Sequence, residues 1–405
     1  MGAGRYDAAA MRPPRIDVHT HILPPPEAWP DLSAKFGYAG WIALEAIARK
    51  GAGGCGCAKM VRIEQQADGR ALRGADGRVP DSGKTFFREI EANCWDPAVR
   101  MAEMDGWGER EMVQVLSTVP VMFGYWARPA DTTELSRWLN DHLAGVCREH
   151  PRRFVGLGTI PMNDPKMAVR ELERCCKDLK FAGVQIGSNV NGRNLGESEF
   201  AEVFAAAEAL GACVFVHPWE MLCGPGMNMG VGGVPRPPVM SPRLGKHWAA
   251  WLVGMPAETC LALCSVIFSG LLERLPRLRI GFAHGGGSFA GTLGRIDHGF
   301  HARPDLCQTE TRLSPRSHAA ARPAKFFVDS LVHDAAALGL LMETVGADRI
   351  MLGSDYPFPL GEECPGTLIR TVPGVSDEDR ERMLSLTAIE FLGSAAAHLA
   401  RGADE

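Results

Sequence analysis

The sequence predicts a protein of the α/β class, a closed (β/α)8 barrel with a small β-rich insertion after its first strand. Two observations predict this fold: eight short runs of apolar residues recur along the chain, and amphipathic, helix-like stretches separate them. Near-continuous apolar runs are typical of parallel strands buried on both faces, and alternation with helices is typical of a parallel sheet. A doubly wound open sheet could also hold eight strands, but no G-x-G-x-x-G motif follows the first run.

The elements follow one another in a regular order. The predicted strands are Arg15–His21, Val113–Val119, Phe154–Ile160, Gly183–Gly187, Cys213–His217, Leu278–His284, Phe326–Val332 and Ile350–Asp355. The predicted helices, several of which begin at an Asp or Ser that can cap them, are Asp131–His150, Asp164–Lys180, Ser198–Leu210, Ala257–Leu275, Phe289–His301, Asp334–Val345 and Ser376–Leu392.

A single catalytic domain over residues 15–393 accounts for most of the 405 residues, between a flexible N-terminus at 1–14 and a tail at 394–405. The segment 48–83 contains two Asp-Gly pairs, which indicate hairpin turns, and the segment 222–243 is a long loop rich in Gly and Pro. Each follows the carboxyl end of a strand. We therefore expect both over the face where barrels carry their active sites.

Composition excludes several classes of protein. The net charge is −5 and basic residues form no stripe, which argues against nucleic acid as a partner. The apolar run Thr259–Leu272 is too short to cross a bilayer, and Met1–Pro14 lacks the apolar stretch of a secretory signal. The twelve cysteines are therefore expected to be reduced thiols, in a cytosolic protein without contact to membranes.

Polar residues that can bind a metal occur where the predicted strands end. His19 and His21 end the first strand, His217 the fifth, His284 the sixth and Asp355 the eighth. These carboxyl ends meet at one rim of a parallel barrel, and residues two apart on a strand point the same way. Imidazole and carboxylate ligands suit Zn²⁺. Each residue alone is a weak signal, but their joint occurrence predicts a metal site.

Longer stretches surround these residues. They include Ile16–Pro24, Asn93–Pro97, Leu116–Phe123, Val216–Trp219, Trp251–Thr259, Ala283–Gly287 and Leu352–Glu362. The order of the histidines and the aspartate resembles the amidohydrolase superfamily of metal-dependent barrels. Within that superfamily, the stretches that begin at Trp251 and Leu352 are most similar to the family of aminocarboxymuconate-semialdehyde decarboxylases.

The resemblance implies one Zn²⁺ per subunit and a catalytic histidine. The implied ligands are His19, His21, His217 and Asp355. His284 would be the acid/base that activates the zinc-bound water. The fourth predicted strand ends at Gly187 and lacks the lysine that bridges two metals in many barrel hydrolases, which favours a single ion.

The resemblance also implies how the substrate is bound. Arg88 and Arg295 match arginines that bind substrate carboxylates, and Trp251 matches an aromatic residue of the pocket. In the family, the second arginine reaches in from a neighbouring subunit, so a homodimer is implied. Arg303 is a weaker candidate for a carboxylate ligand. His333 could either support the metal ligands or begin a helix.

The implied activity is the zinc-dependent, non-oxidative decarboxylation of 2-amino-3-carboxymuconate 6-semialdehyde to 2-aminomuconate 6-semialdehyde and CO₂, in the kynurenine pathway of tryptophan catabolism. Three alternatives remain: a related decarboxylase of hydroxybenzoate-type substrates, a zinc-dependent hydrolase of amides or lactones, and a metal-binding barrel without activity. Release of CO₂ distinguishes decarboxylation from addition of water.

Overall fold

The computed structural model describes residues 13–47, 56–108, 111–222, 233–238 and 241–400. Parts of several predicted segments lie outside the described residues, namely most of 1–14, the first residues of 48–83, much of 222–243 and the end of 394–405.

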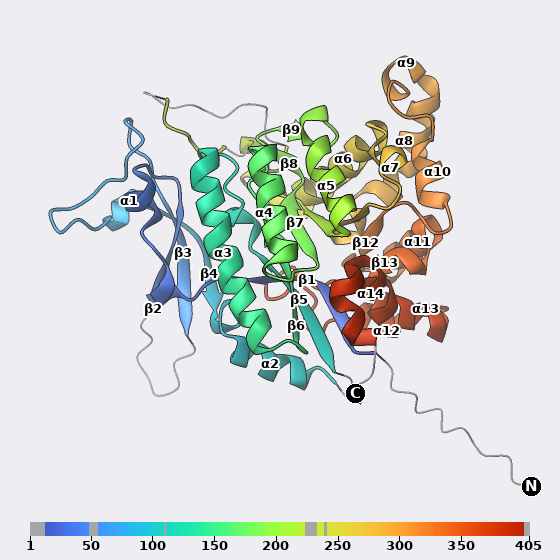
Figure 1. The fold of residues 1–405 in the computed structure, drawn as a ribbon, viewed down its shortest axis with the longest axis horizontal. Helices are drawn as coiled ribbons and strands as arrows, with labels where there is room; N and C mark the ends of the chain where they lie inside the picture. Colours follow the sequence, from blue (N-terminus) through green and yellow to red (C-terminus); the bar gives the residue numbers. More distant parts are fainter. Residues whose placement is uncertain (1–12, 48–55, 109–110, 223–232, 239–240, 401–405) are drawn as a thin grey trace, which may run out of the picture.

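Eight parallel strands form the barrel, paired in the order in which they occur in the chain (Figure 1). They are β1 (Arg15–Ile22), β5 (Met112–Thr118), β6 (Phe154–Thr159), β7 (Gly183–Gly187), β10 (Cys213–His217), β11 (Arg279–Phe282), β12 (Phe327–Asp329) and β13 (Ile350–Met351). The barrel closes through bonds of 2.8 Å from Val18 N to Leu352 O and from His21 N to Tyr356 O. All eight predicted strands are present, so the predicted fold is confirmed.

Side chains from several strands around the barrel fill its inside. Val18 of β1, Val113 of β5 and Phe215 of β10 belong to one buried cluster, which Phe391 of the helix α14 (Thr387–Leu392) joins. Phe391 also accepts a 2.7 Å hydrogen bond at its carbonyl from Arg279, the first residue of β11. The helix α14 therefore closes the end of the barrel where the strands begin, and leaves the carboxyl ends for the site.

Helices cover the outside of the barrel, and every predicted helix is present with shifted ends. The long ones are α3 (Pro129–Glu149), α4 (Pro165–Lys177), α5 (Ala201–Leu210), α6 (Met255–Phe268), α8 (Phe289–Ala302) and α11 (Ala335–Val345). The last predicted helix is α13 (Asp377–Glu381), a π-helical turn and α14 in succession. Short helices complete the set: α1 (Leu32–Phe36), α7 (Leu271–Arg274), α9 (Pro304–Cys307), α10 (Pro315–Ala320) and α12 (Thr367–Thr371).

One helix begins earlier than predicted because its expected cap is used elsewhere, and one capped helix was not predicted. The helix α3 begins at Pro129, before Asp131, because Asp131 does not cap it but accepts a 2.8 Å hydrogen bond from the hydroxyl of Tyr38. The helix α2 (Pro97–Gly106) was not predicted, although Asp96 caps it through a 2.8 Å bond from Ala98 N. Asp164 caps α4 as expected, accepting from Met167 N at 2.9 Å.

The predicted β-rich insertion after the first strand is a three-stranded antiparallel sheet, drawn in blue at the left of Figure 1. Its strands are β2 (Ile42–Ile47), β3 (Cys57–Ile63) and β4 (Lys84–Glu91), so the sheet extends beyond 48–83 at both ends. Both Asp-Gly pairs lie in turns, with Gly69 and Gly77 at φ of 83° and 77°. The sheet packs on the barrel through a cluster that contains Trp41 and Trp126.

Among the described residues, one helix is long and apolar enough to cross a membrane by length and composition alone. It is α6 together with the π-helical turn Ala250–Gly254 before it, 19 residues in all, and it starts earlier than the apolar run Thr259–Leu272. Half of it is buried, and Leu263 and Ile267 lie in the core between barrel and helices. Packing in this core explains its apolar composition.

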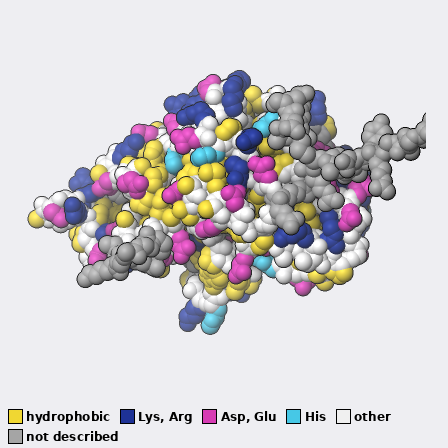
Figure 2. All heavy atoms as spheres, turned by 90° about the horizontal axis from the view of Figure 1, so that it is seen from below, with side chains coloured by type: hydrophobic (Ala, Val, Ile, Leu, Met, Phe, Trp, Pro, Cys, Tyr) yellow, Lys and Arg dark blue, Asp and Glu magenta, His cyan; other side chains and the backbone are white. Residues whose placement is uncertain are grey.

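Charged side chains of both signs are interspersed on the face that Figure 2 shows, where no continuous basic field is seen. This distribution agrees with the small negative net charge of −5.

Candidate metal centre and active site

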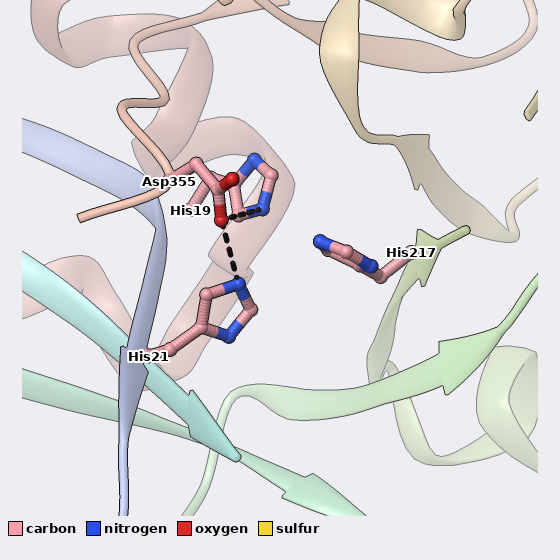
Figure 3. Close-up of side chains that lie close together, drawn as sticks. All are labelled: His19, His21, His217 and Asp355. Carbon is pink, nitrogen blue, oxygen red and sulfur yellow. Dashed lines mark ion pairs between the residues drawn. The ribbon is translucent and has the colours of Figure 1, made fainter. Parts of the chain in front are cut away.

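Four side chains from three separate parts of the barrel meet at the carboxyl ends of its strands (Figure 3). His19 and His21 come from β1, His217 ends β10, and Asp355 follows β13. One ligand atom of each lies within 4.8 Å of the others, and all four residues are buried. The structure thus brings together the complete set that the resemblance implied as metal ligands.

A β-bulge in β1 aims the two histidines. In the pairing of β1 with β5, Asp17 lies opposite Gln114 but Thr20 lies opposite Leu116, so β1 carries one extra residue at this point. Without that residue, a strand that buries Val18 inside the barrel would turn His19 and His21 away from the inside. The bulge therefore allows the apolar filling and the polar site to share one strand.

A hydrogen bond at Nδ1 holds the ring of each of the three histidine ligands. Nδ1 of His21 donates to the carbonyl of Thr118 at 3.0 Å, and Nδ1 of His217 donates to the carbonyl of Pro218 at 2.9 Å. Nδ1 of His19 donates to Asp329 at 2.7 Å. Because Nδ1 carries the proton, Nε2 of each ring is left as a free acceptor. These three Nε2 atoms are buried and have no hydrogen-bond partner among the described residues.

This donor set fits a divalent metal ion. Oδ1 of Asp355 lies 3.0 Å from Nε2 of His21 and 3.4 Å from Nε2 of His19. Ligands about 2.1 Å from a common ion, in tetrahedral arrangement, are separated by about 3.4 Å. Burial and the neighbouring imidazoles hold the pKa of His217 well below its usual value, which favours the neutral form that binds metals.

The carboxylate of Asp355 is ionised in this environment. Burial raises its pKa, but the close imidazoles of His21, His284 and His19 outweigh burial and hold the pKa well below its usual value. Asp355 has a φ of 57°, which is uncommon for a residue other than glycine and is typical of functional sites.

His284 lies beside the four residues without joining their group. It follows β11 with a φ of 55°, and its ring centroid is 5.1 Å from that of His19 and 5.3 Å from that of His217. Its Nε2 is 3.9 Å from Oδ2 of Asp355, and its Nδ1 has no hydrogen-bond partner among the described residues. A histidine so placed can exchange protons with a group bound between it and the metal position.

A pocket opens from the four residues toward the insertion sheet and the segment before α6. Its lining includes His21, His217, Asp355, Arg88 and Trp251. The lining also includes the aromatic residues Phe87, Trp219, Trp248 and Phe358. Arg88 and Trp251, which the resemblance implied as substrate-binding residues, therefore face the same space as the metal ligands.

A second bulge places Arg88. In the pairing of β3 with β4, Met60 lies opposite Arg88 and Val61 opposite Phe86, so Phe87 is the extra residue. Consecutive residues of a regular strand face opposite sides, whereas here both Phe87 and Arg88 line the pocket. The guanidinium of Arg88 lies 4.9 Å from the centre of the Phe87 ring and 4.5 Å from that of Phe358. Burial lowers its pKa, yet no carboxylate neutralises it by direct contact among the described residues.

Three other candidates lie outside the pocket. Arg295 is exposed on α8 and has no ion pair or hydrogen bond among the described residues. Arg303 is also exposed and pairs with Asp305 at 2.7 Å. His333 is exposed immediately before Asp334, the residue that caps α11, so its place is the helix start that was one of its two interpretations.

The sequence reasoning missed two buried aspartates. Asp329 contacts the ring of His19, and Asp17 accepts a 3.2 Å bond from the backbone N of His19 and a 3.1 Å bond from Ser354 N. Asp329 ends an apolar strand just as His217 does, and that pattern could have indicated it. The sequence argument named His333 instead, four residues further along the chain.

Comparison with known proteins identifies the family of the chain. The family model described as Amidohydrolase matches residues 16–394, and the chain belongs to this amidohydrolase family. A 2-amino-3-carboxymuconate-6-semialdehyde decarboxylase of Dictyostelium discoideum is 47% identical over 94% of the chain and 91% of that protein. A gamma-resorcylate decarboxylase of a Polaromonas species is 26% identical over 80% of the chain and 95% of that protein.

A solved structure supports the fold alone. The apo form of IDCase from Metarhizium anisopliae superposes with a TM-score of 0.69 at 19% identity and covers 96% of the chain and 98% of that structure. Both named relatives are decarboxylases, in agreement with the carboxy-lyase class that the sequence predicts.

Proposed function

We propose that this chain is a zinc-dependent decarboxylase that converts 2-amino-3-carboxymuconate 6-semialdehyde to 2-aminomuconate 6-semialdehyde and CO₂, as a cytosolic enzyme of tryptophan catabolism by the kynurenine pathway. The observation that carries the proposal is the group of His19, His21, His217 and Asp355, which faces a pocket containing Arg88. The 47% identity to the Dictyostelium discoideum enzyme supports this choice of substrate. Cys94, Cys175 and Cys213 are buried free thiols, in keeping with the cytosol.

The residues of the site have separate roles in the proposed reaction. His19, His21, His217 and Asp355 would hold a Zn²⁺ ion, which would supply Lewis acidity for activating water or polarising the substrate. Arg88 binds one substrate carboxylate in a two-donor fork, and Trp251 packs against the unsaturated chain. His284 moves the proton: the carbon–carbon bond to the carboxylate breaks, CO₂ leaves, and a proton takes its place on that carbon.

A second arginine is needed for the second carboxylate, because a buried carboxylate without a partner is costly. Among the described residues that line the pocket of one chain, Arg88 is the one arginine. We propose that Arg295 of a second copy completes the site in a homodimer. Large apolar side chains are exposed next to the pocket, with Trp248 at 43%, Leu252 at 52% and Val253 at 63% exposure, as expected for an interface.

A hydroxybenzoate-type substrate is the second candidate. It is favoured by the single arginine and the aromatic walls of the pocket, and by the relative named gamma-resorcylate decarboxylase. An aromatic ring with one carboxylate would need no arginine from a second copy. The two candidates therefore differ in whether Arg295 matters.

The test is an assay of protein reconstituted with one Zn²⁺ per chain, using freshly generated aminocarboxymuconate semialdehyde and, separately, a set of hydroxybenzoates. We expect loss of the semialdehyde absorbance together with stoichiometric release of CO₂. Turnover of hydroxybenzoates alone would select the second candidate. Consumption of substrate without CO₂, or no turnover by metal-loaded protein, would contradict decarboxylation.

A further inference from the structure

One carboxylate contacts both the proposed metal ligand His19 and the turn that carries His284. Asp329 is the last residue of β12 and is completely buried. Its Oδ2 accepts hydrogen bonds from Nδ1 of His19 at 2.7 Å and from the backbone N of His284 at 2.9 Å. Its Oδ1 accepts from the backbone N of Gly285 at 2.8 Å and of Leu331 at 3.1 Å. The side chain of Asp329 thus accepts four hydrogen bonds.

The bond to His19 decides which nitrogen of the ring is available. A carboxylate can only accept, so Nδ1 of His19 carries the proton and Nε2 is free toward Asp355 and the metal position. His21 and His217 bond backbone carbonyls at Nδ1, His21 with a longer 3.4 Å contact to Ser117 Oγ besides. Among the described residues, His19 is therefore the ligand of the three whose Nδ1 bonds a carboxylate. A substitution of Asp329 can therefore change the tautomer of His19.

The bonds to His284 N and Gly285 N hold an unusual turn. Residues 284 to 287 all have positive φ, from 55° at His284 to 75° at Gly286. A non-glycine residue in this conformation persists only when its surroundings hold it. The two backbone bonds to Asp329 come from the first half of the turn, directly where the ring of His284 is attached.

We propose that Asp329 is a positioning residue for the reaction, which keeps Nε2 of His19 free for the metal and fixes His284 at its distance from the same metal position. The inference rests on the proposed function for the role of His284, but its claim about His19 does not depend on any substrate. Carboxylates that bond a metal-binding histidine typically set its tautomer and orientation.

Asp17 provides a matched control. It is the same residue type, is also completely buried and also contacts His19, but through the backbone N at 3.2 Å. Its other partners are the backbone N and the hydroxyl of Ser354. Asp17 bonds no imidazole and no part of the His284 turn among the described residues. Loss of a buried carboxyl group and of its packing is therefore common to Asp17→Asn and Asp329→Asn, whereas the hydrogen bond to Nδ1 of His19 belongs to Asp329.

The experiment compares Asp329→Asn with Asp17→Asn in three measurements. Zn²⁺ affinity, measured by chelator competition, should fall about 10- to 100-fold in Asp329→Asn and less than threefold in Asp17→Asn. At saturating Zn²⁺, kcat of Asp329→Asn should fall about 10- to 100-fold with KM nearly unchanged, because the ring of His284 is misplaced. In ¹⁵N-histidine spectra of metal-free protein, the His19 signal should change from the Nδ1–H to the Nε2–H form in Asp329→Asn only.

The wild-type spectrum tests the proposal even if Asp329→Asn does not fold, since metal-free wild-type protein must show His19 protonated at Nδ1. An unprotonated Nδ1 of His19 in that spectrum would overturn the proposal. Equal losses of Zn²⁺ affinity in Asp329→Asn and Asp17→Asn would also overturn it. Affinity and spectra as expected, in a protein that releases no CO₂ from any substrate tried, would overturn the proposed function and leave the assignment of Asp329 to His19 intact.

Discussion

The two halves of the pocket are built differently. The metal half consists of His19, His21, His217 and Asp355, which the barrel strands supply, and every imidazole is fixed by a hydrogen bond at Nδ1. The substrate half comes from additions to the barrel: Arg88 from the insertion sheet and Trp251 from the π-helical turn before α6. Arg295, the other residue assigned to it, is exposed on an outer helix.

The metal half therefore provides the chemistry, and the substrate half provides the specificity. A buried group that barrel strands hold in place cannot move without disturbing the core, whereas an added sheet and a surface helix can change while the barrel stays the same. Relatives that share the metal half can therefore differ in substrate. If the two halves are independent, a substitution in the substrate half should leave metal binding unchanged.

The largest effect is expected at the metal half. His284→Ala should lower kcat by about 10³-fold, within the range for loss of a general acid/base, while the protein retains one Zn²⁺ per chain because the four ligands remain. Metal content by atomic emission and steady-state kinetics check this. Loss of the metal in His284→Ala would make His284 a ligand and end its separate role.

A smaller effect is expected from the substrate half. Arg88→Ala removes a charge-assisted pair with a carboxylate, so kcat/KM should fall about 100-fold with metal content unchanged. Arg303→Ala is the control, because Arg303 is exposed and pairs with Asp305 away from the pocket. If Arg88→Ala lowered Zn²⁺ affinity by a similar factor, the two halves would not be independent.

Mixing Arg88→Ala and Arg295→Ala chains tests whether two subunits share the substrate half of the pocket. In a dimer that shares its sites, a mixed pair of Arg88→Ala and Arg295→Ala chains has one site with both arginines and one with neither. Random exchange of equal amounts should therefore restore about a quarter of wild-type activity. No recovery after exchange is verified by mass spectrometry of the dimers would place Arg295 outside the site, and would favour the hydroxybenzoate candidate.

The sequence predicted the metal half better than the substrate half, for a physical reason. A strand pattern and a terminal His or Asp are local signals, and the parallel barrel then brings the ends of distant strands together. The two bulges, at His19 and Phe87, depend on pairing between strands far apart in the chain and have no local signal. The role of Asp329 depends on a contact across 310 residues, which no spacing rule reveals.

The smallest effect concerns Glu220, near the junction of the two halves. It lies three residues after His217 and is only partly exposed, and burial raises its pKa from 4.5 to about 7 against the opposing charge of Arg62 from the insertion sheet. Because its pKa is higher in the folded than in the unfolded state, its contribution to stability is complete below about pH 4.5 and is lost as the pH rises through 7. Glu220→Gln carries no such titration. Compared with wild type, it should therefore gain about 2 kcal/mol in free energy of unfolding between pH 5 and pH 8, allowing for partial exposure.

Urea unfolding of both proteins at pH 5, 6, 7 and 8, with Zn²⁺ saturating in each, measures this difference. The difference in unfolding free energy should change steadily with pH in favour of Glu220→Gln. A difference that stays constant from pH 5 to pH 8 would mean that Glu220 is ionised in the folded protein throughout, held so by Arg62. In that case the insertion sheet would contribute a charge that the barrel side requires, and the two halves of the pocket would be coupled through this pair.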